Sequence, residues 1–379
     1  MRDVLDELIA VWRTGATAGL GTVVRTFHSA PRPVGASMVV APDGSVSGSV
    51  SGGCVEGAVY ESATTAMASE KPVLERYGVS DDDAFAVGLT CGGTLDVFVE
   101  PVSRSTFPEL GAVADAVAAD EPVAVATVVR HPDHTLVGKH VVIGETEFSG
   151  SFGTSRRDSA VVDDGRGLLA TGRTAVLTYG LDGERLGNGM DVFIASHAPR
   201  PRMLVFGAID FAAAVAVQGV FLGYRVTVCD ARAVFATAER FPAAAEVVVE
   251  WPHRYLSDEL ANGALDDRTV VCVLTHDPKF DVPLLEIALR HEHFAFVGAM
   301  GSRRTHDDRA SRLKDAGLSD NQLARLSSPI GLDLGARTPQ ETAISIAAEI
   351  VARRWGGTGE PLAEQRGRIH HDRIADDHA

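Results

Sequence analysis

Two patterns of apolar and polar positions divide the chain. Up to about residue 198, short runs with alternating faces predict the strands of an antiparallel sheet. These runs are "AGLGTVVRTF", "GASMVVAPDGSVSGSV" with a Pro-Asp-Gly turn inside it, "TLDVFVEPV", "PVAVATVVR" and "HTLVGKHVVI". The opening segment "MRDVLDELIAVWRTG" and residues 55–69 have helical periodicity. This half therefore predicts an α+β domain.

The second half has continuous apolar runs separated by helical stretches. The runs are found in "MLVFGAIDFAAAVAVQGVFLGYRVTVCDAR", "AEVVVE", "RTVVCVLTH" and "HFAFVGAMG". Such strands are buried on both faces, which is typical of a parallel, doubly wound sheet. The segment "RTPQETAISIAAEIVARRW" predicts a helix with Thr338 and Glu341 as its capping box.

The fold class we expect is α/β. An N-terminal α+β domain with an antiparallel sheet would span residues 1–198, and a C-terminal Rossmann-like domain with a doubly wound parallel sheet would span 199–356. Residues 357–379 would form a polar C-terminal tail. A length of 379 residues and a hydrophobic content of 45% agree with two globular domains.

Charge and cysteine usage exclude several classes of protein. The net charge is −16, from 35 basic and 51 acidic residues without a basic run, which argues against nucleic acid or an anionic membrane as the partner. No apolar run reaches the roughly 18 residues that span a bilayer, and we identify no secretory signal. The four cysteines form no C-x-x-C pair, which argues against a zinc ribbon and favours a reducing cytoplasm.

The turn "GAIDFA" at 207–212 bears on nucleotide binding. A dinucleotide site wants G-x-G-x-x-G here and an acid about 20 residues later. Asp230 meets the second demand, but Ile209 stands where the second glycine would let the backbone approach a pyrophosphate. Asp210 places a carboxylate where a phosphate would sit. The pattern predicts a Rossmann fold whose usual dinucleotide-binding turn is altered. NAD(P) binding is the alternative.

Two later loops combine glycine with arginine after predicted strands. The candidate anion-binding residues are Gly298, Gly301, Ser302, Arg303 and Arg304 of "VGAMGSRRTHDDR", and Asp333 and Arg337 of "PIGLDLGARTPQE". Guanidinium groups beside backbone amides can bind a phosphate or a pterin. The alternative is a pair of solvated loops. His276 and Asp277 of "THDPKFD" are candidates for polar contacts at the same sheet edge, or simply a helix cap.

The stretch "SVSGGCVEGAV" places a single thiol, Cys54, between a strand and a helix. We expect the turn around Gly53 to leave amides exposed, which together with the helix dipole would favour the thiolate. Glu56 can cap the helix, and Cys91 in "TCGG" is a second thiol flanked by glycine. From the pattern alone Cys54 is a soft ligand, a nucleophile or a small buried residue. A Cys protease is poorly supported because no local histidine motif accompanies the thiol.

The remaining residues of interest are Arg32 and the two cysteines Cys229 and Cys272. Arg32 lies in the Pro/Gly-framed loop "SAPRPVGASM", which can hold an anion or simply be a rigid turn. Cys229 and Cys272 end apolar strands and are predicted to be buried.

These motifs together resemble the XdhC/CoxI family of chaperones for molybdenum hydroxylases such as xanthine dehydrogenase. The matching stretches are "SAPRPVGASMVV", "SGGCVEGAV", "GLTCGGTLDVFVEP", "LTHDPKFD", "VGAMGSRRT" and "PIGLDLGARTPQETAISIAAEIVA". They run through residues 29–352 in the family's order. One departure is "GAIDFA", where relatives carry a Gly-Ala-Gly-His type of turn.

The resemblance implies a role, a cofactor and partners. Such proteins bind the molybdenum cofactor (molybdopterin), protect it during sulfuration and deliver it to the apo molybdenum hydroxylase. A cysteine desulfurase and a homodimer belong to the same expectation. Cys54 would be the residue in contact with the metal centre, and Cys91 the second candidate. The chain would thus be a cofactor-binding chaperone and not a turnover enzyme.

Two rival functions are considered. An NAD(P)-dependent oxidoreductase would use the Rossmann domain. The xanthine dehydrogenase polypeptide itself would need about eight cysteine ligands for two [2Fe–2S] clusters, and this chain has four cysteines in total.

Overall fold

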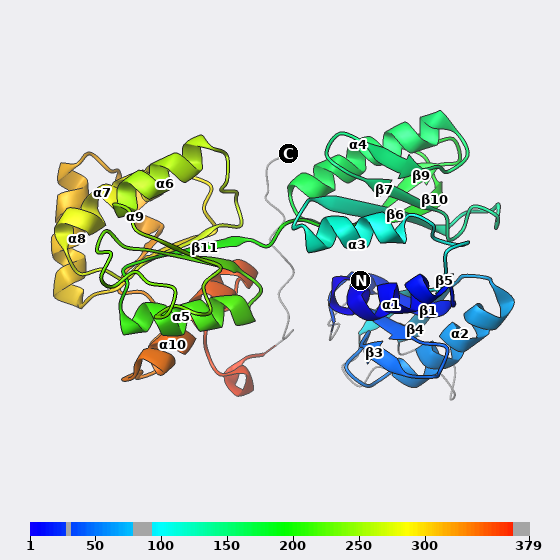
Figure 1. Ribbon diagram of the computed structural model, residues 1–379, viewed down its shortest axis with the longest axis horizontal. Helices are drawn as coiled ribbons and strands as arrows, with labels where there is room; N and C mark the ends of the chain where they lie inside the picture. Colours follow the sequence, from blue (N-terminus) through cyan, green and yellow to red (C-terminus); the bar gives the residue numbers. More distant parts are fainter. Residues whose placement is uncertain (28–31, 79–92, 367–379) are drawn as a thin grey trace. The chain divides into compact units, whose positions relative to one another are not determined.

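The protein separates into two compact units (Figure 1), the first covering Met1–Pro199 and the second beginning at Arg200. The computed structural model describes residues 1–27, 32–78 and 93–366. The predicted fold class is confirmed: the first unit holds antiparallel sheets and the second a parallel sheet. In the described part of the chain no helix is both long and apolar enough to cross a membrane.

The first unit begins with a five-stranded antiparallel sheet in the order β3-β2-β1-β5-β4. Its elements are η1 (Arg2–Val4), α1 (Leu5–Thr14), β1 (Ala18–Phe27), β2 (Ser37–Val40), β3 (Val46–Gly48), α2 (Glu56–Ser69), β4 (Val73–Gly78) and β5 (Thr94–Val102). The helix α2 packs on this sheet through Val59, Ala63 and Ala66. Gly19 of β1 permits the close approach, because a Cβ there would lie 2.8 Å from the Cβ of Ala63.

The same arrangement then occurs a second time. The elements are α3 (Leu110–Ala118), β6 (Val123–Arg130), β7 (His140–Ile143), β8 (Phe148–Gly150), α4 (Ser155–Ala170), β9 (Ala175–Gly180) and β10 (Gly189–His197), with the sheet order β8-β7-β6-β10-β9. Element order and strand order match the first half one for one. The unit is therefore an internal duplication with two antiparallel sheets, whereas the sequence pattern predicts a single one.

The duplication is also visible in the sequence. "TVVR" at 22–25 recurs at 127–130, and "DVF" at 96–98 recurs at 191–193. Both copies of each motif occupy the same place, in β1 and β6 and in β5 and β10. Matched positions in the two halves can therefore be compared directly.

The two halves share their core. Each half has its own cluster beneath its helix, but two further clusters draw residues from both. One of these contains the matched pairs Val24 with Val129 and Phe98 with Phe193. A buried ion pair also joins the halves, since Nη2 of Arg25 lies 2.9 Å from Oδ2 of Asp191. Unit 1 is thus one folding unit built from two similar halves.

The second unit is a doubly wound parallel sheet in the order β13-β12-β11-β14-β15-β16. Its elements are β11 (Arg202–Phe206), α5 (Asp210–Phe221), β12 (Arg225–Cys229), β13 (Glu246–Val248), α6 (Pro252–Ala261), β14 (Val270–Val273), α7 (Pro278–Arg290), β15 (Phe296–Ala299), α8 (Arg303–Asp315), α9 (Asp320–Ala324), β16 (Leu326–Ser327), α10 (Pro339–Trp355) and η2 (Leu362–Glu364). The strand order reverses between β11 and β14. Loops that follow these two strands flank the usual ligand crevice of such sheets.

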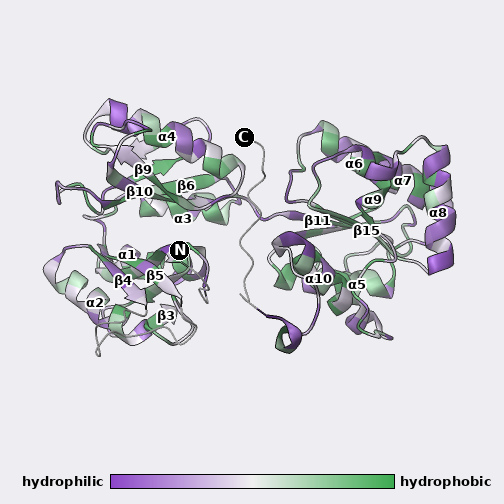
Figure 2. Ribbon diagram, turned by 180° about the vertical axis from the view of Figure 1, so that it is seen from behind, coloured by the Kyte–Doolittle hydropathy of each residue, from purple (hydrophilic) through white to green (hydrophobic). Residues whose placement is uncertain are grey.

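Helices cover both faces of this sheet (Figure 1). The cores assign α5 and α10 to one face and α6, α7 and α8 to the other. In Figure 2 the strands β11 and β15 carry hydrophobic colour, while α8 is largely hydrophilic. Cys229 and Cys272 are buried as predicted, and burial raises the pKa of each thiol to about 12.

Candidate functional site

The loop that carries Cys54 runs from the end of β3 to the start of α2. Gly52 and Gly53 have φ angles of +76° and +116°, which only glycine adopts without strain. A Cβ added at either glycine would meet no heavy atom within 4 Å, so the surface over this turn is open. The Cys54 side chain is half-buried and packs against the core beneath α2.

Glu56, in the first turn of α2, holds the loop in place. Its carboxylate accepts hydrogen bonds from Ser49 Oγ at 2.7 Å, from Ser51 N at 2.9 Å and Oγ at 2.5 Å, and from Gly53 N at 2.8 Å. Burial alone would raise the pKa of Glu56. The hydrogen bonds from Ser51 and Ser49 outweigh burial and lower that pKa to about 2.

The second half of unit 1 repeats this arrangement at its matched position. Asp158 in α4 accepts from Ser151 Oγ at 2.7 Å and from Phe152 N at 2.7 Å. The carboxylate is therefore a feature of the duplicated fold, and Glu56 positions the loop. Arg156 occupies the place that corresponds to Cys54, so the fold itself does not require a cysteine there.

The expectation of exposed amides around Cys54 is wrong. Ser51 Oγ accepts from the amides of Cys54 and Val55, each at 2.9 Å, and Ser49 Oγ accepts from Gly52 N at 2.9 Å. The Gly53 amide is bonded to Glu56. These donors hold the loop, so they are not free to stabilise a bound anion or a thiolate.

The remaining candidates of unit 1 are placed differently. The Arg32 side chain donates to Asp3 Oδ2 at 3.2 Å, and both groups are partly exposed. Cys91 lies outside the described residues. The structure thus brings together Gly53, Cys54 and Glu56 in one loop, and it pairs Arg32 with η1.

In unit 2 the turn that follows β11 is closely packed, and its polar groups are hydrogen-bonded within the protein. The φ angle of Gly207 is +112°, and a Cβ there would come within 2.8 Å of Thr275 Cγ2. Asp230, the acid that a dinucleotide site needs, accepts from Ala208 N at 2.7 Å, from the Arg232 backbone amide at 2.9 Å and from the Arg232 guanidinium at 2.9 and 2.7 Å. Burial would raise the pKa of Asp230, but these partners lower it. The carboxylate is therefore engaged by the turn and by Arg232.

The loops after β14, β15 and β16 meet around a residue that sequence reasoning missed. Arg309 of α8 is buried and donates to Asp281 Oδ2 at 3.0 Å, to Met300 O at 2.8 Å and to Ser328 Oγ at 3.0 Å. Asp281 also accepts from the Thr275 hydroxyl. Both charged residues stand within or beside quoted motifs, "THDPKFD" and "GSRRTHDDR", but their pairing across 28 residues has no local signal.

The glycines and caps in these loops have structural roles. A Cβ at Gly298 would lie 2.5 Å from Ile330 Cδ1, so this glycine lets the loop at 329–337 pack against β15. Gly301 has a φ of +155°, and Ser302 caps α8 by accepting from Thr305 N at 3.1 Å. Asp277 caps α7 and pairs with Lys279 at 3.1 Å, so the simpler interpretation of that motif holds.

The arginines of these loops remain available for a ligand. Arg303, Arg304 and Arg337 have exposed side chains, and none of them forms an ion pair within the described part of the chain. Asp333 is exposed on the same loop as Arg337. The edge of unit 2 thus offers several unpaired guanidinium groups, which suits phosphate recognition.

No group of three or more His, Cys, Asp or Glu side chains is placed to hold a metal ion among residues 1–27, 32–78 and 93–366. A half-buried thiol beside open surface fits one contact to a metal centre that brings its other ligands with it, because a thiolate is a soft ligand.

Comparison with known proteins places the chain among relatives of matching length. It is 27% identical over 339 residues to a Bacillus subtilis protein whose name describes it as a probable subunit of xanthine dehydrogenase, covering 89% of this chain and 93% of that protein. It is 27% identical over 353 residues to the molybdenum cofactor insertion chaperone PaoD of Escherichia coli, covering 93% and 88%. A crystal structure described as a xanthine dehydrogenase from Bacillus halodurans has the same fold, with a TM-score of 0.68, 23% identity and coverage of 95% and 97%.

Family models match both units. The model described as the XdhC Rossmann domain matches residues 203–350, and the model of the XdhC and CoxI family matches residues 11–78 and 116–180. The last two ranges cover corresponding parts of the two halves of unit 1. The chain belongs to the XdhC/CoxI family.

Proposed function

We propose that this protein binds the molybdenum cofactor, assists its sulfuration and promotes its insertion into a molybdenum hydroxylase of the xanthine dehydrogenase type. The observation that carries the proposal is the Cys54 thiol on a loop held by Glu56, with open surface over Gly52 and Gly53. The name of the E. coli relative supports the same role.

The two units would contribute different chemistry. In unit 1 Cys54 would contact the metal or its sulfur ligands, since soft thiolate donors suit such a centre. Unit 2 by itself offers Arg303, Arg304 and Arg337 for recognition of a phosphate group, because guanidinium groups form paired, charge-assisted hydrogen bonds with phosphate oxygens. The fixed loop at Cys54 would present the thiol without a cost for ordering the backbone.

The role implies partners. Sulfuration of the metal centre needs a sulfur donor, for which a cysteine desulfurase is the expected source, and insertion needs the apo molybdenum hydroxylase. We place the reaction in the cytoplasm and expect the protein to act as a homodimer. Both statements are part of the proposal.

The test is cofactor binding by matched variants. Molybdopterin binding is measured for the wild type, for Cys54→Ser and for Arg156→Ser, which alters the corresponding position of the second half. We expect Cys54→Ser to weaken binding at least about tenfold and Arg156→Ser to have no effect. If the wild type has no affinity for the cofactor, the proposed function fails. If Cys54→Ser binds as well as the wild type, the role of the thiol is wrong.

The alternative of an NAD(P)-dependent oxidoreductase has no supporting observation in this structure. Asp230 is engaged by Ala208 and Arg232, and Ile209 stands where a glycine would admit a pyrophosphate. Titration with NADH and NADPH is the direct test. Saturable binding at micromolar concentration would favour the oxidoreductase.

A further inference from the structure

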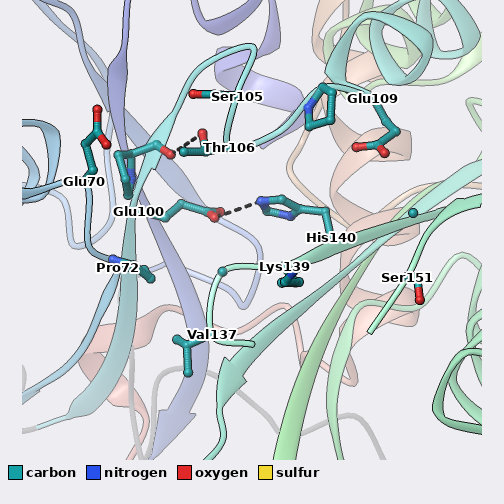
Figure 3. A pocket seen from close by; sticks show the side chains of 14 residues that line it. Glu70, Pro72, Glu100, Ser105, Thr106, Glu109, Val137, Lys139, His140 and Ser151 are labelled. Carbon is teal, nitrogen blue, oxygen red and sulfur yellow. Dashed lines mark hydrogen bonds and ion pairs between the residues drawn. The ribbon is translucent and has the colours of Figure 1, made fainter. Parts of the chain in front are cut away.

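Unit 1 contains a cleft far from Cys54. It has a volume of about 360 Å³ and lies between the two halves of the unit (Figure 3). Its walls come from the end of α2, the end of β5, the segment before α3, the β6–β7 connection with the start of β7, and the end of β8. Cys54 precedes α2 and Glu70 follows it. The 14 residues of this helix therefore separate thiol and cleft by about 21 Å along the axis.

A buried pair of polar side chains, His140 and Glu100, lies in the wall of the cleft. His140 Nε2 is 3.1 Å from Glu100 Oε2, and the two side chains are only 3% and 8% exposed (Figure 3). His140 Nδ1 lies 3.0 Å from Thr127 Oγ1, and its ring stacks on Phe107 with centroids 3.9 Å apart. These contacts fix the imidazole and, through it, the Glu100 carboxylate.

Three more charged side chains line the cleft beside His140 and Glu100. In Figure 3 Glu70 and Glu109 lie on opposite sides of the Glu100–His140 pair, and Lys139 lies below it. None of the three forms an ion pair within the described part of the chain. Three carboxylates therefore face one lysine and one histidine, so acidic groups outnumber basic groups in the cleft.

The duplication provides an internal control, because each position of the cleft has a matched position in the opposite half. The matched positions carry neutral residues: Gly172 for Glu70, Ala195 for Glu100, Val4 for Glu109, Ala36 for Lys139 and Ser37 for His140. None of the five ionisable side chains that line the cleft is thus repeated at its matched position. A difference confined to one cleft points to a ligand and not to a requirement of folding.

The backbone at Glu70 supports the same conclusion. Its φ angle is +55°, in the left-handed region that disfavours residues with a Cβ. The matched residue Gly172 has a φ of +62° and meets the same demand without strain. The first half keeps a strained glutamate where the second uses glycine, which is expected when the side chain has a function.

We infer that this cleft binds a small organic cation that carries an ammonium or guanidinium group. Glu100, fixed by His140, lies in its wall, and Glu70 and Glu109 complete the negative charge. The inference goes beyond the proposed cofactor binding and does not depend on it, because the cleft shares no residue with the Cys54 loop.

The probes are agmatine and putrescine, with butane-1,4-diol as the neutral and succinate as the anionic control, each measured by calorimetric titration of the full chain. We expect saturable binding of at least one amine at up to millimolar concentration and none of the diol or succinate. The absence of amine binding, or equal binding of the diol, overturns the inference.

Three variants test whether the negative charge of the cleft determines amine binding. Glu70→Gly copies the second half and should weaken amine binding about tenfold, while leaving the melting temperature unchanged or higher because the strain is removed. Lys139→Ala should strengthen binding, since it removes a positive charge. Glu145→Gln, at an exposed acid outside the cleft, should change nothing. Unchanged affinity in Glu70→Gly, or weaker binding in Lys139→Ala, contradicts the inference.

Discussion

Replacing Arg309 by methionine removes the residue that joins α7 to the loops after β15 and β16. The ion pair between Arg309 Nη2 and Asp281 Oδ2 spans 3.0 Å, and its side chains are 3% and 4% exposed. The same guanidinium donates to Met300 O and Ser328 Oγ. Methionine is unbranched and apolar, so the change removes the charge and the hydrogen bonds while filling much of the space.

The expected loss is large because Asp281 would remain buried without its cation. Breaking a buried ion pair on one side costs about 3–5 kcal/mol. We expect Arg309→Met to lower the free energy of unfolding of unit 2 by about 4 kcal/mol. The double variant Arg309→Met/Asp281→Asn removes the orphaned charge and should recover about half of that loss.

The loss in the free energy of unfolding of unit 2 should also depend on pH. Burial raises the pKa of Asp281, although Thr275 and Arg309 act in the opposite direction. Because the folded-state pKa lies above the unfolded value, folding favours the protonated acid, and its contribution to stability falls as the pH rises through that window. Removing Arg309 moves the folded-state pKa further up. The loss should therefore be smaller at acidic pH than at neutral pH, because protonation of Asp281 removes the uncompensated charge.

Urea unfolding followed by tryptophan fluorescence measures this loss. The chain has three tryptophans, and Trp251 and Trp355 belong to unit 2, so the Trp12→Phe background restricts emission to that unit. A loss of less than about 1 kcal/mol, no recovery in the double variant, or a larger loss at acidic pH would each refute the reasoning.

Three further predictions concern other parts of the fold. Glu56→Gln should destabilise unit 1 by about 2 kcal/mol. Because hydrogen bonds lower the folded-state pKa of Glu56 to about 2, the wild type should lose this advantage as the pH falls from about 4.3 toward that value; urea titrations should therefore give a smaller difference between wild type and variant at about pH 3 than at about pH 7. Gly19→Val should cost about 1–3 kcal/mol, seen as a lower melting temperature, because a Cβ would come within 2.8 Å of Ala63. Iodoacetamide should leave Cys229 and Cys272 unmodified in the native protein and label both in urea, as peptide mass spectrometry can establish, because burial raises the pKa of both thiols to about 12.

The fold class followed from the sequence because hydrophobic periodicity reflects burial directly. Continuous apolar runs such as "VVCV" became buried strands of the parallel sheet, and alternating runs became strands of the antiparallel sheets. The capping box of Thr338 and Glu341 was also predicted from the sequence, and the structure confirms it. These features depend on residues within a few positions of one another.

Contacts between distant segments could not be predicted in this way. The pairing of Arg309 with Asp281 and of His140 with Glu100 depends on how loops meet in space. The amides around Cys54 were expected to be free because the sequence does not reveal that Ser51 already accepts from them. The duplication was available in principle, but only by comparing the chain with itself.

The duplication also changes what one polypeptide can do. A dimer of identical chains must carry every functional residue twice, once in each protomer. In unit 1 two equivalent halves are covalently joined, so each position can differ between them: Cys54 in one half and Arg156 in the other, Glu70 in one and Gly172 in the other. The shared core retains the stability of a two-part assembly, and the surface of each half is free to specialise. In the described part of unit 1 the Cys54 loop and the charged cleft therefore each occur once per chain, where an assembly of identical halves would present two of each.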